Sequence, residues 1–371
     1  MLIETEIPVL DELQHRLDIP ASYYEKSVER YKAIGEWLCR EASTVRDFAP
    51  DIYSHGSFRL GTVIHPLSRE GAYDLDLVCC INLNTGEVSQ KDLKQLIGRE
   101  IELYAERFSI SAPVDESPRC WRLDYADELS FHMDILPCVP RPTDVRAQAQ
   151  EGAYSGSVLI TDNRLSNYAQ LSPQWLTANP LGIGSWFESR CITTHLFEAK
   201  MAQKSIAEVP AYTWKTPLQK AIQVLKRHRD RTFRDNPEFA PSSMIITVLA
   251  ALAYKGTVTL TDSLNDILSD FTAGLTSRGC RLPNPTNQEE DFAEKWKLRP
   301  ALETNFFSWL AQARSDIMNL ATVQRFSESV SLAKKAFDVD LAGRQQLRPS
   351  SELPATGPTV IVSPPKPWER K

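Results

Sequence analysis

The chain has 371 residues and a mass of 41.9 kDa, with 24% charged and 42% hydrophobic residues, which is typical of a globular protein with a substantial core. Its net charge of −6 and pI near 5.7 disfavour a protein that binds long nucleic acids stably. The sequence has no secretory signal and no run of about 18 apolar residues, so we expect a cytoplasmic protein without a membrane span. Seven scattered cysteines without Cys-x-x-Cys spacing predict free thiols.

A predicted amphipathic helix over residues 21–43 precedes the first motif, which is Gly56-Ser57 at the start of a short helix. A glycine and a serine at a helix start offer backbone N–H donors, a hydroxyl and the positive end of the helix dipole. Such a turn can bind anionic oxygens, although alone it is more often an ordinary helix cap. Arg59 is a candidate for a charge-assisted contact with phosphate, and it could equally face solvent.

Two acidic residues, Asp74 and Asp76, lie in an apolar, β-branched run over residues 73–81. The period-2 alternation of a strand places both carboxylates on one face, about 6.5 to 7 Å apart. Two divalent cations about 3.5 to 4 Å from one another fit this spacing. A single Asp-x-Asp is common at solvated strand ends, so the pair gains meaning only together with its neighbours in the sequence.

A third acidic residue, Asp134, lies in a second apolar run over residues 129–139 that also reads as a strand. If this strand lies beside the strand of Asp74, three carboxylates come together. Such a trio would repel itself without cations, and hard oxygen ligands favour Mg²⁺, with Mn²⁺ as the alternative. The sequence therefore predicts two bound metal ions near the Gly-Ser turn.

The second half of the chain is predominantly helical. Helix-period apolar stripes predict helices over residues 218–231, 242–254, 260–275, 301–320 and 323–337. Proline residues near position 210 indicate a lobe boundary there, so we divide the chain into a catalytic lobe over 1–209, a helical lobe over 210–344 and a flexible Pro-rich tail over 345–371. The tail is either a plain extension or a short peptide for a regulatory protein partner.

The order of Gly56-Ser57, Asp74-x-Asp76 and Asp134 resembles the signature of the DNA polymerase β-like nucleotidyltransferase superfamily. Within it, the chain most resembles the bacterial CD-NTases, the oligonucleotide cyclases of CBASS antiphage systems and relatives of cGAS and oligoadenylate synthase. The segments that favour this subfamily are residues 179–187, 218–229 with 241–247, and 284–296. The resemblance implies an α+β fold, with a polymerase β-like core of mixed sheet and helices and an α-helical C-terminal lobe.

The resemblance also implies roles for individual residues. Asp74 and Asp76 would bind both metal ions, and Asp134 would bind the catalytic ion and help to deprotonate a ribose hydroxyl. Gly56 and Ser57 would bind the donor triphosphate. Lys226 and Ser243 match positions that contact the phosphates from the helical lobe in such enzymes.

We therefore expect a metal-dependent nucleotidyltransferase that joins ATP and other nucleoside triphosphates into an adenine-containing cyclic di- or trinucleotide. This second messenger would activate an effector protein in antiphage defence. One alternative is a linear nucleotidyltransferase acting on RNA or a small acceptor. Another is a catalytically silent protein that senses nucleotides or bridges partners.

Overall fold

The computed structural model describes residues 8–68, 71–125, 131–142, 156–191, 215–271, 275 and 281–342. The helices are α1 (Val9–His15), α2 (Ala21–Cys39), α3 (Gly56–Leu60), α4 (Gln90–Arg107), α6 (Pro180–Cys191), α8 (Pro217–Thr232), α9 (Ser243–Ala253), α10 (Leu260–Asp270), α12 (Glu294–Leu298), α13 (Ala301–Thr322) and α14 (Phe326–Phe337), with 3₁₀ turns at Arg46–Phe48 and Pro237–Phe239. The strands are β1 (Asp51–His55), β2 (Tyr73–Cys80), β3 (Asp115–Glu116), β4 (Trp121–Tyr125), β5 (Phe131–Pro140), β6 (Val158–Ile160), β7 (Leu176–Ala178), β8 (Pro283–Asn284) and β9 (Asn287–Asp291).

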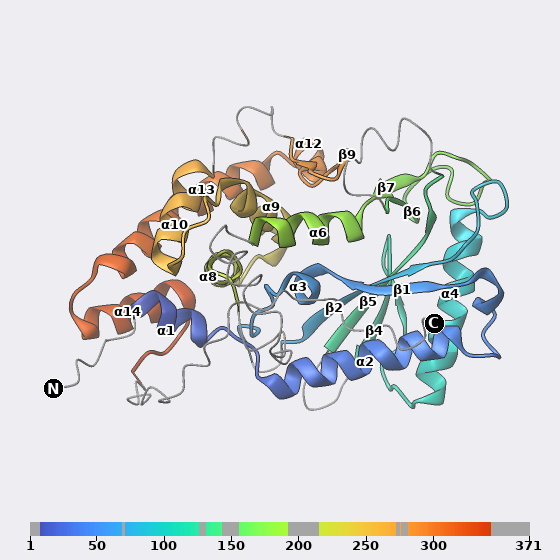
Figure 1. The fold of residues 1–371 in the computed structure, drawn as a ribbon, viewed down its shortest axis with the longest axis horizontal. Helices are drawn as coiled ribbons and strands as arrows, with labels where there is room; N and C mark the ends of the chain where they lie inside the picture. Colours follow the sequence, from blue (N-terminus) through green and yellow to red (C-terminus); the bar gives the residue numbers. More distant parts are fainter. Residues whose placement is uncertain are drawn as a thin grey trace, which may run out of the picture.

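The central sheet is mixed and has the strand order β1-β2-β5-β4-β3. Strands β2 and β5 run parallel, whereas the other pairs are antiparallel. Strand β6 pairs with β5 near its end, and β7 pairs with β6. Helices α2 and α4 lie at the sheet, and most of the other helices gather at the opposite end of the molecule (Figure 1). The architecture agrees with the predicted α+β class.

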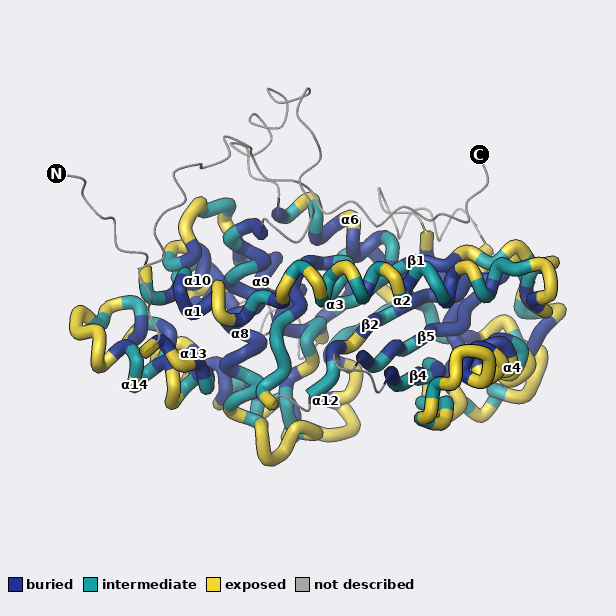
Figure 2. The backbone as a smooth tube through the Cα atoms, turned by 90° about the horizontal axis from the view of Figure 1, so that it is seen from below, coloured by how far each residue is buried: buried dark blue, intermediate teal, exposed yellow. Residues whose placement is uncertain are grey.

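The two faces of the sheet are covered unequally. One face packs against α2 and α4 in a core that contains Leu75, Leu77 and Met133. Figure 2 shows β2 and β5 as largely buried, whereas the turns of α2 alternate between buried and exposed residues. On the opposite face, Val78 and Cys138 belong to a smaller core to which β6 and β7 also contribute residues. This small core covers only the later part of β2.

Helix α8 begins at a strong start signal. The Thr216 hydroxyl accepts a hydrogen bond from the backbone N–H of Gln219, and the Gln219 side chain accepts one from the backbone N–H of Thr216. This reciprocal pair is a capping box, and Pro217 occupies the first helical position, where no N–H donor is needed. The helix therefore starts at a defined residue and presents a fixed set of side chains to the sheet.

The helical part of the molecule has its own apolar core, which includes residues from outside the predicted lobe over 210–344. Leu10 and Leu13 of α1 and Trp186 and Phe187 of α6 are buried in this core together with α8, α9, α10 and α13. The division at residue 209 therefore does not follow the packing, because the apolar stripes of α1 and α6 bury themselves against helices far along the chain. The predicted boundary itself and the tail over 345–371 lie outside the described residues.

None of the helices in the described ranges combines the length and the apolar character that a membrane crossing requires.

Candidate functional site

The acidic residues of β2 and β5 lie next to one another in the sheet. In the parallel register, Asp76 pairs with Asp134 and Asp74 pairs with His132. The prediction that the strand of Asp134 neighbours the strand of Asp74 is therefore confirmed. Because residues of matching register in parallel strands point to the same face, all three carboxylates occupy one face of the sheet.

This face is open where the carboxylates lie. Along β2, Asp74 is exposed and Asp76 is partly buried, whereas Val78 and Cys80 further along the same face are buried. Asp134 on β5 is also only partly buried. The site therefore begins where the small core that includes residues of β6 and β7 ends, which leaves charged groups accessible beside an apolar support.

Crowding of the acidic groups disfavours their charged forms. Burial raises the pKa of Asp76 to about 6, with the negative charge of Asp134 adding to the effect and Lys226 opposing it. Desolvation also raises the pKa of Asp74, and the charges of Asp76 and Asp134 act in the same direction. Mutual repulsion among three carboxylates indicates a place where positive charge from a ligand would be favourable.

The Gly56-Ser57 turn lies directly against these carboxylates. Gly56 has a φ of +66°, and a Cβ on this residue would be 1.8 Å from Oδ2 of Asp76. The backbone N–H of Ser57 donates a hydrogen bond to Asp76 and lowers its pKa. Only glycine satisfies both the backbone conformation and the close approach at this position. The turn and the acidic pair therefore form one structural unit.

Helix α8 attaches the helical part to the loop that follows this turn. Its side chains donate to four backbone carbonyls between residues 60 and 65: Gln219 to Leu60, Lys226 to Thr62, Gln223 to Val63, and Arg227 to His65. The Nζ of Lys226 also donates to the Thr62 hydroxyl at 2.9 Å. One face of α8 thus positions the Gly-Ser loop through polar contacts that are almost fully buried.

Lys226 is a buried cation close to the acidic residues. Burial and the charge of Arg229 lower its pKa to about 7, although Asp230, Asp76 and Asp74 oppose this shift. A lysine that is only 5% exposed and keeps its ammonium near carboxylates is suited to bind an anion that enters the site. The structure therefore brings Lys226 near the predicted metal ligands.

Ser243 is the first residue of α9 and contacts α8 through Arg229. Its hydroxyl accepts a hydrogen bond of 2.8 Å from Arg229, which also donates to the carbonyl of Pro241. Arg229 lines an open hollow with about 1000 Å³ of free space, together with Trp296 and Arg299. The helical part therefore has an open hollow of its own, at the end of α8 where Arg229 lies.

Arg59 lies near the site and lines a small pocket that Asp76 also lines. It packs against α6, where a Cβ on Gly184 would be 2.4 Å from the Arg59 Nε. Desolvation by burial lowers the pKa of Arg59, and the charge that opposes this most strongly is that of Glu188 on α6. The guanidinium is thus directed at α6, and its predicted contact with phosphate stays a prediction.

Sequence reasoning missed Arg122 on β4. Arg122 pairs in register with Asp134, and its guanidinium contacts both carboxylate oxygens at 2.8 and 2.9 Å. The signal was present, because Arg122 and Asp124 alternate with Leu123 in the same way as the acidic pair of β2. His132 on the same face contacts Asp124.

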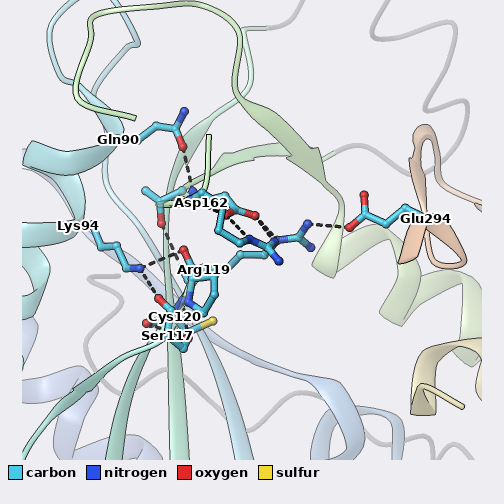
Figure 3. Close-up of polar contacts among 10 residues, drawn as sticks. Gln90, Lys94, Ser117, Arg119, Cys120, Asp162 and Glu294 are labelled. Carbon is cyan, nitrogen blue, oxygen red and sulfur yellow. Dashed lines mark hydrogen bonds and ion pairs between the residues drawn. The ribbon is translucent and has the colours of Figure 1, made fainter. Parts of the chain in front are cut away.

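A polar network connects the sheet with the β9–α12 segment of the helical part (Figure 3). Arg119 donates to Asp162 at 3.0 Å and to Glu294 of α12 at 2.8 Å. Arg164 donates to the same Asp162, and the backbone N–H of Asp162 donates to Gln90. These contacts hold α12 and the start of β4 together beside the site.

The donor set suits magnesium in its chemistry, because it consists of carboxylate oxygens on one open face. Within the ranges that the structure describes, however, no three acidic, histidine or cysteine side chains form a ready cation site. At the third carboxylate, Asp134, both oxygens instead contact the guanidinium of Arg122. The chemistry of the carboxylates suits a divalent cation, whereas their present arrangement includes an arginine beside Asp134.

Comparison with known proteins agrees with this geometry. Residues 50–137 match the family described as "Cyclic GMP-AMP synthase DncV-like, nucleotidyltransferase domain", a range that contains the Gly-Ser turn and all three carboxylates. A c-di-GMP synthase of Roseivirga ehrenbergii is 29% identical over 319 residues, which cover 84% of this chain and 78% of that protein. The cyclic dinucleotide synthase CdnG of Bradyrhizobium diazoefficiens is 24% identical over 391 residues, which cover 96% of this chain and 89% of that protein.

Solved structures show the same fold. That of the Bradyrhizobium diazoefficiens CD-NTase CdnG in complex with GTP has a TM-score of 0.68 at 22% identity and covers 89% of this chain and 93% of its own. The structure of the Vibrio cholerae cyclic AMP-GMP synthase DncV has a TM-score of 0.56 at 13% identity, and the match covers 89% of this chain and 94% of DncV. The polymerase β-like core with a helical lobe is thereby confirmed, and the matches together support a member of the CD-NTase family of nucleotidyltransferases.

Proposed function

We propose that this enzyme joins ribonucleoside triphosphates into a cyclic oligonucleotide. The observation that carries the proposal is the parallel register of Asp76 with Asp134 on an open face, directly beside the Gly56-Ser57 turn. The relatives named as cyclic dinucleotide synthases support ring closure over a linear product. In each transfer, a ribose oxygen attacks the α-phosphorus of a triphosphate and pyrophosphate leaves.

Asp74, Asp76 and Asp134 would hold two Mg²⁺ ions, with Mn²⁺ as the alternative. Such ions, when bound, polarise the phosphate and favour the ionised form of a ribose hydroxyl. The carboxylate of Asp134 would accept the proton of the attacking hydroxyl. Its place on the open face of the sheet, in register with Asp76, supports this role.

The donor triphosphate would bind between the Gly-Ser turn and α8. Gly56 permits close approach of the phosphate to the backbone, and Ser57 offers its N–H and hydroxyl. Lys226 would contribute its ammonium, and Ser243 its hydroxyl, from the helical side. The hollow lined by Arg229 and Trp296 would receive a nucleoside, because it combines an aromatic side chain with charged groups and is lined in part by Arg229, which contacts Ser243.

The choice of nucleotide bases is a separate part of the proposal. The sequence favours an adenine-containing product by resemblance alone. The names of the relatives, a c-di-GMP synthase and a CdnG solved with GTP, favour guanine in at least one position. We therefore propose that GTP is a substrate and that ATP is its competitor or its partner in a mixed ring.

We also propose that the enzyme acts in the cytoplasm, in antiphage defence, through an effector that binds the cyclic product. A regulatory protein partner would act through the tail over 345–371. The Escherichia coli CdnC, whose structure is solved in complex with a HORMA protein, supports partner regulation in a protein of similar fold, with a TM-score of 0.59.

One incubation tests the proposed reaction. Full-length protein is mixed with the four radiolabelled ribonucleoside triphosphates and Mg²⁺ or Mn²⁺, and the products are treated with a phosphatase and their masses are measured. A phosphatase-resistant product with the mass of a ring is expected, and an Asp76→Asn variant should form none. A phosphatase-sensitive product would favour the linear nucleotidyltransferase. Failure to release pyrophosphate from any nucleotide would favour the silent nucleotide-sensing protein.

A further inference from the structure

Arg122 contacts the third carboxylate of the site at two points. Its Nε donates to Oδ1 of Asp134 at 2.8 Å and its Nη2 donates to Oδ2 at 2.9 Å. This two-point geometry uses both oxygens of Asp134. The two residues are paired in register on the neighbouring antiparallel strands β4 and β5, so the contact is set by the sheet rather than by a flexible loop.

The guanidinium also acts on the other two carboxylates. Its hydrogen bonds with Asp134 raise the pKa of Arg122, and the charges of Asp134 and Asp74 add to this. Its positive charge in turn lowers the pKa of both Asp74 and Asp76. Arg122 is therefore a counter-ion for the whole acidic trio.

We propose that Arg122 holds the position of a divalent cation in the metal-free protein and competes with that cation for Asp134. The inference rests on the proposed metal-dependent function. While both oxygens of Asp134 accept hydrogen bonds from the guanidinium, lone pairs of the carboxylate are occupied and a positive charge lies beside it, and both effects oppose the binding of a metal ion. Arg122 would thus set the affinity of the site for metal and is a positioning residue for Asp134.

The exposure of the pair makes this exchange feasible. The side chain of Arg122 is 38% exposed and that of Asp134 is 23% exposed. Ion pairs at such positions are weak because water screens them, so a divalent cation that gains several carboxylate ligands can displace the guanidinium. Release of Arg122 into solvent requires no repacking of an apolar core.

Direct metal binding to the full-length, nucleotide-free protein tests this inference. Mn²⁺ affinity is measured by titration calorimetry and by the electron paramagnetic resonance signal of free Mn²⁺, for wild type, Arg122→Gln and Arg122→Lys. Removal of the competitor should raise the affinity of Arg122→Gln by roughly fivefold to tenfold. Arg122→Lys keeps the charge but lacks the paired donors, so its affinity should lie between the two.

Thermal unfolding supplies a second readout. Without metal, Arg122→Gln should unfold at a lower temperature than wild type, because three carboxylates lose their counter-ion. Added Mn²⁺ should raise the unfolding temperature of Arg122→Gln by more than it raises that of wild type. The matched control is Arg40→Gln, which removes an arginine from the buried Glu100 on the α2–α4 side of the sheet. This control should lower stability and leave Mn²⁺ affinity unchanged.

The outcomes separate this inference from the proposed function. If wild type binds Mn²⁺ and Arg122→Gln binds it equally or more weakly, Arg122 is no competitor and the inference fails while the function stands. If Arg40→Gln raises the Mn²⁺ affinity as much as Arg122→Gln does, the inference about Arg122 also fails. If neither wild type nor Arg122→Gln binds Mn²⁺ more tightly than an Asp76→Asn variant does, the metal-dependent function fails and the inference fails with it.

Discussion

Gly56 and Asp76 are in such close contact that a single added carbon would break the arrangement. A Cβ on Gly56 would be 1.8 Å from Oδ2 and 2.6 Å from Cγ of the Asp76 side chain. His55 pairs in register with Asp76, so the turn leaves β1 directly beside the acidic pair of β2. The sheet register therefore fixes the distance between the proposed phosphate-binding turn and a proposed metal ligand.

The first prediction is that Gly56→Ala nearly abolishes turnover. The alanine would occupy a φ of +66°, which is unfavourable for residues with a Cβ, and its methyl group would displace the Asp76 carboxylate. A displacement of about 1 Å at a catalytic group can cost about 100-fold in rate. We expect a drop in kcat/KM of at least about that size, together with a slightly lower melting temperature.

The matched control for this substitution is Gly86→Ala. Gly86 lies in an exposed loop without a positive φ, and its nearest neighbour is the end of the flexible Asn84 side chain. This variant should keep wild-type turnover. Equal activity of Gly56→Ala and wild type in the pyrophosphate-release assay would show that the close approach has no part in catalysis.

The second prediction concerns the carboxylates of β2. Asp74→Ala and Asp76→Ala should each reduce turnover by at least about 1000-fold, because each removes a proposed metal ligand. Their melting temperatures without metal should equal or exceed that of wild type, since removal of one carboxylate relieves repulsion in the trio. Asp115→Asn, an exposed residue of β3, is the control with unchanged activity. Near-normal turnover of either alanine variant would refute the proposed site.

The third prediction concerns Lys226. Lys226→Met keeps a long side chain in a position that is 5% exposed, but it removes the ammonium that donates to Thr62. Its KM for nucleoside triphosphate should rise about tenfold or more with a smaller change in kcat. The reason is that the ammonium would bind phosphate equally in the substrate complex and in the transition state, so its removal weakens substrate binding more than it slows the chemical step. The control is Lys220→Met on the same helix. The Nζ of Lys220 lies 3.8 Å from Oδ1 of Asp11 on α1, so this lysine pairs with a carboxylate outside the proposed site. An unchanged KM would remove Lys226 from the phosphate site.

The part of the site that local periodicity governs could be predicted from sequence. Alternation along a strand placed Asp74 and Asp76 on one face, and the structure confirms the parallel neighbour that carries Asp134. Lys226 lies beside the apolar stripe of its helix, and the structure places its charge near the acidic residues. The shared face of Asp74 and Asp76 follows from a repeat within a few residues, whereas the contact of Lys226 with phosphate stays a prediction.

The features that sequence reasoning missed depend on contacts between distant segments. The pairing of Arg122 with Asp134 requires the register of β4 on β5, which alternation alone does not specify. Arg59 is directed at α6 because Gly184 leaves room for its side chain, and nothing near Arg59 in the sequence indicates that neighbour. Likewise, the packing of α1 and α6 with the helical core follows from long-range burial of apolar surface.

The fourth prediction concerns the acid stability that Asp162 contributes through Arg119 and Arg164. Burial alone raises the pKa of Asp162, but hydrogen bonds from Arg164 and Arg119 outweigh this effect and lower the pKa to about 2. Because an aspartate in the unfolded chain has a pKa of about 3.9, the folded protein favours the ionised form. The resulting stability is fully present above about pH 4 and is lost as the pH falls through 2.

Urea unfolding of wild type and Asp162→Asn between pH 7 and pH 3 measures this contribution. At pH 7 the variant should be less stable by about 1–3 kcal/mol, because charged hydrogen bonds to a buried carboxylate are lost. The difference should shrink as the pH approaches 3, since the wild-type carboxylate then loses its advantage over the amide. Asp47→Asn, at an exposed position, should follow wild type throughout. A difference that is constant with pH would show that Asp162 acts by packing rather than by its charge.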